Sequence, residues 1–178
     1  MLWSTQYFAY MTWLPQYLVD LGLSVDGALL GYALPVAIML PSILMTGRLV
    51  QRGVPIGRLL VIGLALQAAT WGLLPLAGDG VWGVGTLVLY GIGAGIVPTC
   101  LFAAPSRIAG RGQANARAFG IMMTGRNTGV LMGPILLAQA FELAGGWTWA
   151  APILGTVTAG ALALGLWLGV RLGRAAVA

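Results

Sequence analysis

The sequence contains no lysine and no histidine, and among its 178 residues it has only one cysteine and four acidic residues. With no histidine, and with Cys100 as the single thiol, the usual ligands of a metal site are missing and no disulfide can form within one chain. Few groups remain that could act as acid, base or metal ligand in catalysis. We therefore expect neither an enzyme nor a bound metal or cofactor.

Charge of either sign is scarce. Charged residues make up 7% of the chain and hydrophobic residues 59%, whereas a soluble domain carries about 25% charged residues. A soluble fold of this size could not cover its surface, so the lipid bilayer is the expected solvent. The net charge of +5 would suggest nucleic-acid binding in a soluble protein, but here the arginines are spread between apolar runs, and we expect no nucleic-acid partner.

Six apolar segments follow one another along the chain, most of them long enough to cross a hydrocarbon core about 30 Å thick. They predict an all-α membrane protein with one six-helix transmembrane domain over residues 1–178. Gly78-Asp79-Gly80 predicts a turn between the third and fourth helices. The predicted helices are residues 3–19, 28–46, 59–76, 81–104, 118–141 and 149–170.

Six helices sort the charged residues by side, which a count of five or seven does not. The arginines of one side are Arg48, Arg52, Arg58, Arg107, Arg111, Arg117, Arg171 and Arg174. The acids of the other side are Asp20, Asp26, Asp79 and Glu142. Arginine marks cytoplasmic loops, so both termini are expected in the cytoplasm, in a bacterial cytoplasmic (inner) membrane. No basic segment precedes the first helix, which favours a retained helix over a cleaved signal peptide.

Arg126 is the ninth arginine and the one that breaks this pattern. It follows Arg117 by about 13 Å of helix, and an intramembrane charge by default suggests a functional site. The alternative is that the fifth helix begins late and Arg126 reaches back to the cytoplasmic interface. Asn127, next to it, adds a hydrogen-bonding group. An arginine at such a site favours an anionic ligand.

Several short motifs resemble those of the major facilitator superfamily. The segment after the second apolar run reads Gly47-Arg48-Leu49-Val50-Gln51-Arg52-Gly53. It resembles the family's loop motif Gly-x-Leu-Ala-Asp-Arg-Gly, with Gln51 in place of the aspartate and the following Gly-Arg displaced to Gly57-Arg58. In the fifth helix, Gly129-x-x-x-Gly133-Pro134 resembles the Gly-x-x-x-Gly-Pro of the family's fifth and eleventh helices.

The resemblance implies one half of a twelve-helix secondary transporter, built from inverted three-helix repeats, that moves a small solute by alternating access. The altered loop motif favours the C-terminal half, helices seven to twelve. The expected partner is then the missing N-terminal half. We expect a truncated chain rather than a complete six-helix protein; if the chain is complete, a second copy is the expected partner. No acid lies in a predicted helix, so any proton-coupling carboxylate is expected on the other half.

Substrate candidates follow from the family's use of the first and fourth helices of each half to line the solute path. They are Gln6, Tyr10, Trp13, Tyr90 and Thr99, together with Arg126 and Asn127. The first three share one face with Tyr17, which is expected as an interface anchor. Simple helix packing explains this face equally well.

The glycine stripes favour close helix packing over a direct ligand role. They comprise Gly91, Gly95, Gly125, Gly129 and Gly133. A different function remains open, in which such stripes pack the chain on a partner as a non-transporting membrane scaffold or accessory subunit.

Overall fold

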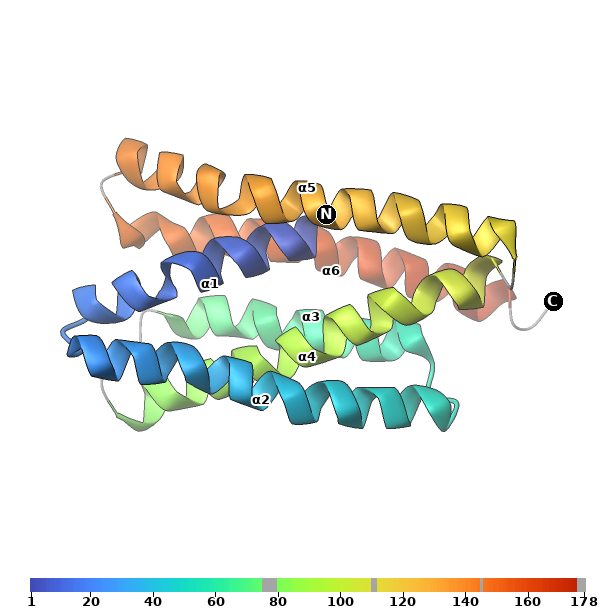
Figure 1. The fold of residues 1–178 in the computed structure, drawn as a ribbon, viewed down its shortest axis with the longest axis horizontal. Helices are drawn as coiled ribbons and strands as arrows, with labels where there is room; N and C mark the ends of the chain where they lie inside the picture. Colours follow the sequence, from blue (N-terminus) through green and yellow to red (C-terminus); the bar gives the residue numbers. More distant parts are fainter. Residues whose placement is uncertain (75–79, 110–111, 145, 176–178) are drawn as a thin grey trace.

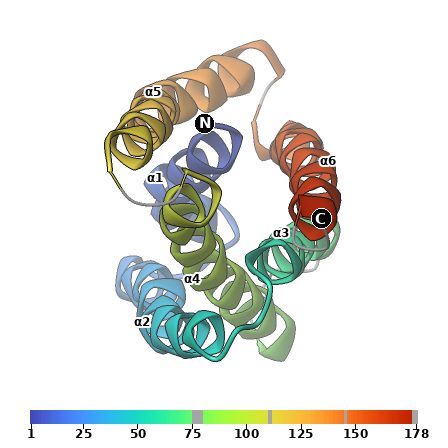
Figure 2. The same cartoon turned by 90° about the vertical axis from the view of Figure 1, so that its right-hand side faces the viewer.

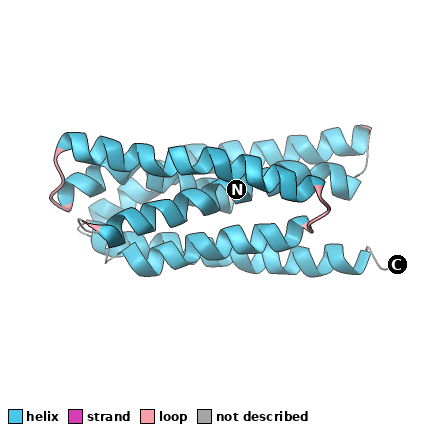
Figure 3. Cartoon of the chain, turned by 90° about the horizontal axis from the view of Figure 1, so that it is seen from below, coloured by secondary structure: helices cyan, strands magenta, loops and turns pink. Residues whose placement is uncertain are grey.

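The computed structural model describes residues 1–74, 80–109, 112–144 and 146–175. These described residues form six long helices and one short 3-10 turn, without a strand (Figures 1 and 3). The elements are α1 (Leu2–Asp20), α2 (Val25–Gln51), α3 (Ile56–Leu73), α4 (Val81–Ala109), α5 (Gln113–Ala144), η2 (Trp147–Trp149) and α6 (Ala150–Ala175).

Several helices run beyond the apolar segments that predict them. Helix α5 begins at Gln113, five residues before its apolar segment, and α2 continues through Gly47 and Arg48 to Gln51. The first five residues of the loop motif, 47–51, lie beyond the predicted helix 28–46 but are helical in the structure. A charged side chain does not interrupt the backbone hydrogen bonds of a helix, so the end of an apolar run does not mark the end of a helix. Of the expected turn and loop residues, Gly78, Asp79 and Arg111 lie outside the described residues.

The first two helices end in the same way, each at a glycine with a positive φ. Gly22 has φ +97° and Gly53 has φ +86°. The next amide reaches back to a carbonyl five residues earlier, from Leu23 to Leu18 at 3.1 Å and from Val54 to Leu49 at 3.0 Å. This is the Schellman arrangement, for which glycine is the preferred residue. The last glycine of the loop motif is thus a helix cap.

Viewed end-on, α1 and α4 occupy the middle of the bundle, while α5 and α2 form its two far edges (Figure 2). Helices α3 and α6 lie together on one side. Helix α1 packs mainly on α5, and α4 packs mainly on α2 and α3. The central helices α1 and α4 therefore lie between the edge helices, α5 and α2, and the α3–α6 pair.

Buried side chains form two apolar clusters. The larger one contains Tyr10, Leu14, Trp71, Tyr90 and Leu154, and the smaller one is built on Leu60, Leu64 and Val97. By contrast, α2 exposes a row of large apolar side chains, which are Leu29, Leu30, Leu40 and Leu44. An apolar outer surface of this kind suits contact with lipid rather than water.

By length and composition, four of the described helices are apolar enough to cross a membrane: α2, α3, α4 and the segment Trp147–Val170. Helices α1 and α5 fall short of that standard. Both carry polar side chains within the helix, such as Gln6 in the second turn of α1 and Arg126 and Asn127 near the middle of α5. These two helices also pack on each other.

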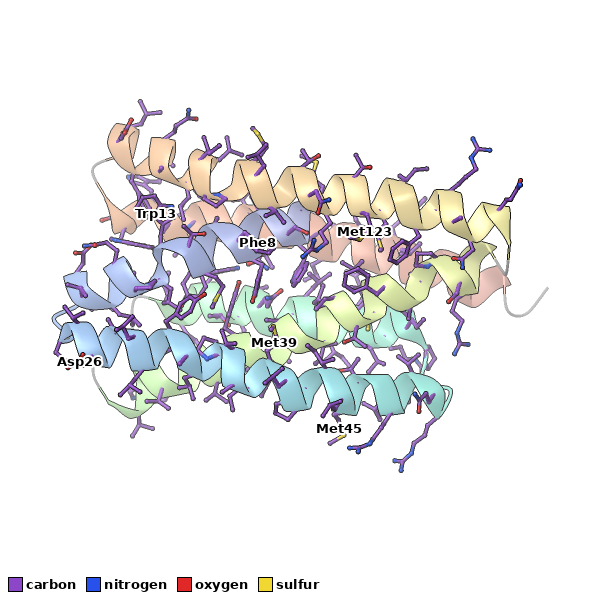
Figure 4. All side chains as sticks on the ribbon, in the orientation of Figure 1. Phe8, Trp13, Asp26, Met39, Met45 and Met123 are labelled. Carbon is purple, nitrogen blue, oxygen red and sulfur yellow. The ribbon has the colours of Figure 1, made fainter. Side chains whose placement is uncertain are left out.

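Among the described residues, the acids and the arginines near the helix ends lie at opposite ends of the bundle, and Arg126 lies between them. Asp26, labelled in Figure 4, lies at the end where α1 stops and α2 starts. Arg52, after α2, and Arg58, in the first turn of α3, lie at the other end, which we call the arginine end. Helix α6 runs to the arginine end, but Met1 lies near the middle of the bundle's length (Figure 1). Helix α1 has 19 residues where α5 has 32, and the cytoplasmic position of the termini stays a prediction.

Candidate functional site

Arg126 lies on α5 and faces α1. Its Nη1 donates a hydrogen bond to the side chain of Asn127 at 3.1 Å, and its guanidinium carbon lies 5.9 Å from the ring centre of Phe8 on α1. The side chain is partly buried. No carboxylate of the described residues pairs with it. Most of its five N–H donors are thus free for another ligand.

The position of Arg126 along the bundle is close to mid-length. At 1.5 Å per residue it lies about 20 Å from the start of α5 at Gln113 and about 27 Å from its end at Ala144. In Figure 4, Phe8 and Met123 lie near the middle of the bundle, and Arg126 is one turn of α5 beyond Met123. Because α5 does not begin late, the charge is far from both ends of its helix.

A small cavity adjoins this arginine. It has a volume of about 160 Å³ and lies between the start of α1, α4 and α5. Arg126, Trp3 and Phe102 are among its lining residues. The indole N–H of Trp3 is buried and has no acceptor among the described residues. The cavity is well below the size of pockets that enclose drug-sized ligands, so it has room for a small group only.

A second polar cluster is fully buried between α1, α3 and α4. Gln6 donates from Nε2 to Oε1 of Gln67 at 3.1 Å, and its own Oε1 accepts from the hydroxyl of Tyr90 at 3.4 Å. Nε2 of Gln67 is buried without a partner in the described part of the chain. Gln67 is not among the residues that the sequence analysis selects. It is the only side-chain amide in the third apolar segment, and a lone amide in such a segment is the sequence feature that could have identified it.

Aromatic rings surround this cluster. Tyr10 contacts Tyr90 with ring centres 4.6 Å apart and Trp71 with ring centres 5.0 Å apart. The indole N–H of Trp71 donates to the hydroxyl of Thr158 on α6 at 2.7 Å. The structure thus brings together three of the sequence candidates, Gln6, Tyr10 and Tyr90, in one packed polar and aromatic centre.

Trp13, Thr99 and Tyr17 bond to backbone carbonyls, although Tyr17 belongs to the same buried cluster as Tyr10 and Tyr90, and Trp13 packs against it. Trp13 donates to the carbonyl of Pro134 at 3.2 Å, joining α1 to α5. Thr99 donates within its own helix, to Gly95, at 2.9 Å. Tyr17, expected at the membrane interface, is instead buried and donates to the carbonyl of Leu74 at 3.0 Å. All three hydroxyl or indole groups are thus satisfied by backbone.

The glycine stripes lie where helices touch. A Cβ on Gly91 would come within 2.7 Å of the Pro35 carbonyl oxygen on α2. On α5, a Cβ on Gly129 would come within 2.6 Å of the Met1 carbonyl oxygen, and one on Gly133 would collide with the carbonyl of Thr5. Gly125 is in looser contact with α1. Such close approach requires residues without a side chain.

Around the loop motif, the arginines remain at the surface. Arg48, Arg52 and Arg58 are exposed, and Gly47 has open space around its Cα. The motif therefore forms a short basic connection from the end of α2, around the Gly53 cap, to the first turn of α3.

Comparison with known proteins gives one family. The model of the Major Facilitator Superfamily matches residues 1–116, which span α1 to α4 and the first turn of α5 and include the loop motif. No curated protein and no solved structure matches the chain significantly. The match covers well over half of the 178 residues. The chain belongs to the Major Facilitator Superfamily, a family of membrane transporters.

Proposed function

We propose that the chain is one six-helix half of a secondary transporter, most like helices seven to twelve, and that it moves a small solute by alternating access. All six helices, α1 and α5 included, then lie within the membrane, and α1 as described extends from the middle of the bundle to its acidic end. The arginine end faces the cytoplasm, as the positive-inside rule requires, in a bacterial inner membrane.

The packing pattern supports inverted three-helix repeats. Exchanging α1–α3 with α4–α6 turns the α1–α5 contact into the α4–α2 contact, and the α1–α6 contact into the α4–α3 contact. The α3–α6 contact maps onto itself. Figure 2 agrees, since α1 and α4 are central and α2 and α5 lie at opposite edges. Transporter halves built from such repeats place their solute sites near the bilayer midplane.

Arg126 is the single observation that carries the solute proposal. It lies near mid-length of α5, is only partly buried and has no acidic partner among the described residues. A charge at that depth is expensive in lipid and is tolerated when it faces a water-filled path or an opposite charge. We propose that Arg126, with Asn127, binds an anionic solute in a path completed by the other half or by a second copy.

The first test is ligand-dependent thermal unfolding of the purified chain in detergent. A panel of small carboxylates, phosphates, sugars and amines is added at millimolar concentration, and Arg126→Gln is compared with Arg117→Gln. Both variants lose one arginine of α5, but Arg117 is exposed near the helix start. A ligand present at 100 times its Kd stabilises by about 2.7 kcal/mol, which is a readily measured shift.

We expect at least one anion class to stabilise the wild type and Arg117→Gln but not Arg126→Gln. Equal stabilisation of all three proteins would remove Arg126 from the site. Stabilisation by neutral solutes alone, unchanged in Arg126→Gln, would contradict the proposal that the solute is an anion.

A further inference from the structure

A large groove opens at the arginine end, away from Arg126. It has a volume of about 810 Å³ and lies between the start of α3 and the ends of α4 and α6. The helices α3 and α6 touch beside it, since a Cβ on Gly57 would come within 2.9 Å of the Gly169 Cα. Both glycines line the groove. Their lack of side chains lets α3 and α6 approach closely at the edge of the groove.

Two arginines stand at the groove, Arg58 from α3 and Arg107 from α4. Both are exposed. Arg107 donates one long hydrogen bond, at 3.4 Å, to the Val50 carbonyl, and Arg58 makes none within the described residues. The described acids, Asp20, Asp26 and Glu142, all belong to the other end of the bundle. Nothing in the described chain neutralises these two guanidinium groups.

The remaining wall is apolar and faces outward. Ile62 on α3 is 51% exposed, and Leu166 and Val170 on α6 are 50% and 55% exposed. These residues belong to the helices that are apolar enough to cross a membrane. The groove thus combines an exposed apolar wall, which suits lipid acyl chains, with the side chains of Arg58 and Arg107 at the level where the apolar helices end.

We propose that this groove binds an anionic phospholipid. Arg58 and Arg107 hold the phosphate through charge-assisted hydrogen bonds, for which guanidinium groups are well suited. The acyl chains lie along Ile62, Leu166 and Val170. Basic pockets between transmembrane helices on the cytoplasmic side suit anionic headgroups, and the apolar wall distinguishes a lipid from a free phosphate ion. The site is separate from Arg126 and independent of the transported solute.

The experiment measures lipid retained per chain. The protein is reconstituted in vesicles of equal parts phosphatidylglycerol and phosphatidylcholine, extracted in mild detergent, and analysed by native mass spectrometry. Arg58→Gln/Arg107→Gln is compared with Arg48→Gln/Arg117→Gln, which removes the same charge from the same end but outside the groove. We expect the wild type and the control to retain phosphatidylglycerol preferentially, and the groove variant to lose about fivefold in affinity per arginine.

A third variant separates lipid from phosphate. Leu166→Trp fills part of the apolar wall and leaves both arginines in place, so it should lower phosphatidylglycerol retention. Inorganic phosphate, tested as a competitor, should displace little lipid. The proposal is overturned if phosphatidylcholine is retained equally, if the control loses as much as the groove variant, or if phosphate competes fully while Leu166→Trp has no effect.

Discussion

At the residue scale, Gln6 links three helices through one side chain. It is fully buried, donates to Gln67 on α3 and accepts from Tyr90 on α4. A buried polar group without a partner costs about 1–3 kcal/mol, although interhelical hydrogen bonds in membranes average about 0.6 kcal/mol. Gln67 is already in part unsatisfied, because its Nε2 has no partner among the described residues.

This asymmetry predicts different effects for two similar substitutions. Gln6→Leu leaves both the Gln67 carbonyl and the Tyr90 hydroxyl without their partner, so we expect a loss of about 1–3 kcal/mol in the free energy of unfolding. Gln67→Leu removes one hydrogen bond but also the unpaired N–H, so its loss should be smaller. Unfolding of the purified protein in mixed micelles, titrated with a denaturing detergent, measures both.

The double variant supplies the control for this pair. Gln6→Leu/Gln67→Leu should be less destabilised than the sum of the two single variants, because each single substitution strands a group that the double one removes. Strict additivity would mean that the hydrogen bond between them contributes nothing.

The sequence identified Gln6 and Tyr90 as candidates but could not show that they meet. The contact joins residues 84 positions apart, and the Gln6–Gln67 bond joins residues 61 apart. Helical spacing shows which residues share a face of one helix, but not which face of another helix is opposite. Trp13 illustrates the same limit, since its spacing places it beside Tyr10 whereas its hydrogen bond goes to α5.

At the element scale, the four-residue spacing of small residues on α4 sets how closely it approaches α2. A Cβ on Gly95 would come within 2.7 Å of the Met39 carbonyl oxygen, whereas Gly85 on the same helix has nothing within 4 Å. Gly95→Ala must therefore push the two helices apart.

These two glycines give a matched prediction for α4. Gly95→Ala should destabilise the protein by about 1–3 kcal/mol, as overpacking does. Gly85→Ala should be neutral or stabilising by up to about 1 kcal/mol, because alanine is the better helix former. Thermal unfolding in the same detergent compares the two variants, and a Gly95→Ala protein as stable as Gly85→Ala would contradict the close approach of α2 and α4.

The positions of helix ends could be predicted less well than the helices' apolar middles. Hydropathy marks the part of a helix that suits lipid, but α5 continues from Gln113 to Ala144 through Arg117 and Glu142. Its polar residues are also the reason that hydropathy alone does not rank it among the membrane-crossing helices. The features that weaken the membrane signal of α1 and α5 are those that mark them as candidates for the solute path.

At the scale of the whole molecule, α5 exposes polar side chains around its mid-length. Thr124, Asn127 and Thr128 are exposed near Arg126, next to the exposed apolar residues Ile121 and Leu131, whereas only apolar side chains, Ile135 and Leu136, are exposed about two turns further along. Exposed threonine and asparagine side chains are unfavourable on a helix that is entirely surrounded by lipid. The polar stretch therefore supports an aqueous path on this side of the bundle, closed by the other half or by a second copy.

The proposed solute path is tested most directly by cysteine labelling along α5 in intact membranes. The native thiol, Cys100, is buried and is first replaced by alanine. Asn127→Cys and Leu136→Cys are then treated with a small, charged, membrane-impermeant thiol reagent. If α1 and α5 border a water-filled path at mid-membrane, Cys at position 127 reacts and Cys at position 136 does not. Equal inertness of both positions would place this face of α5 in lipid and contradict the proposed path.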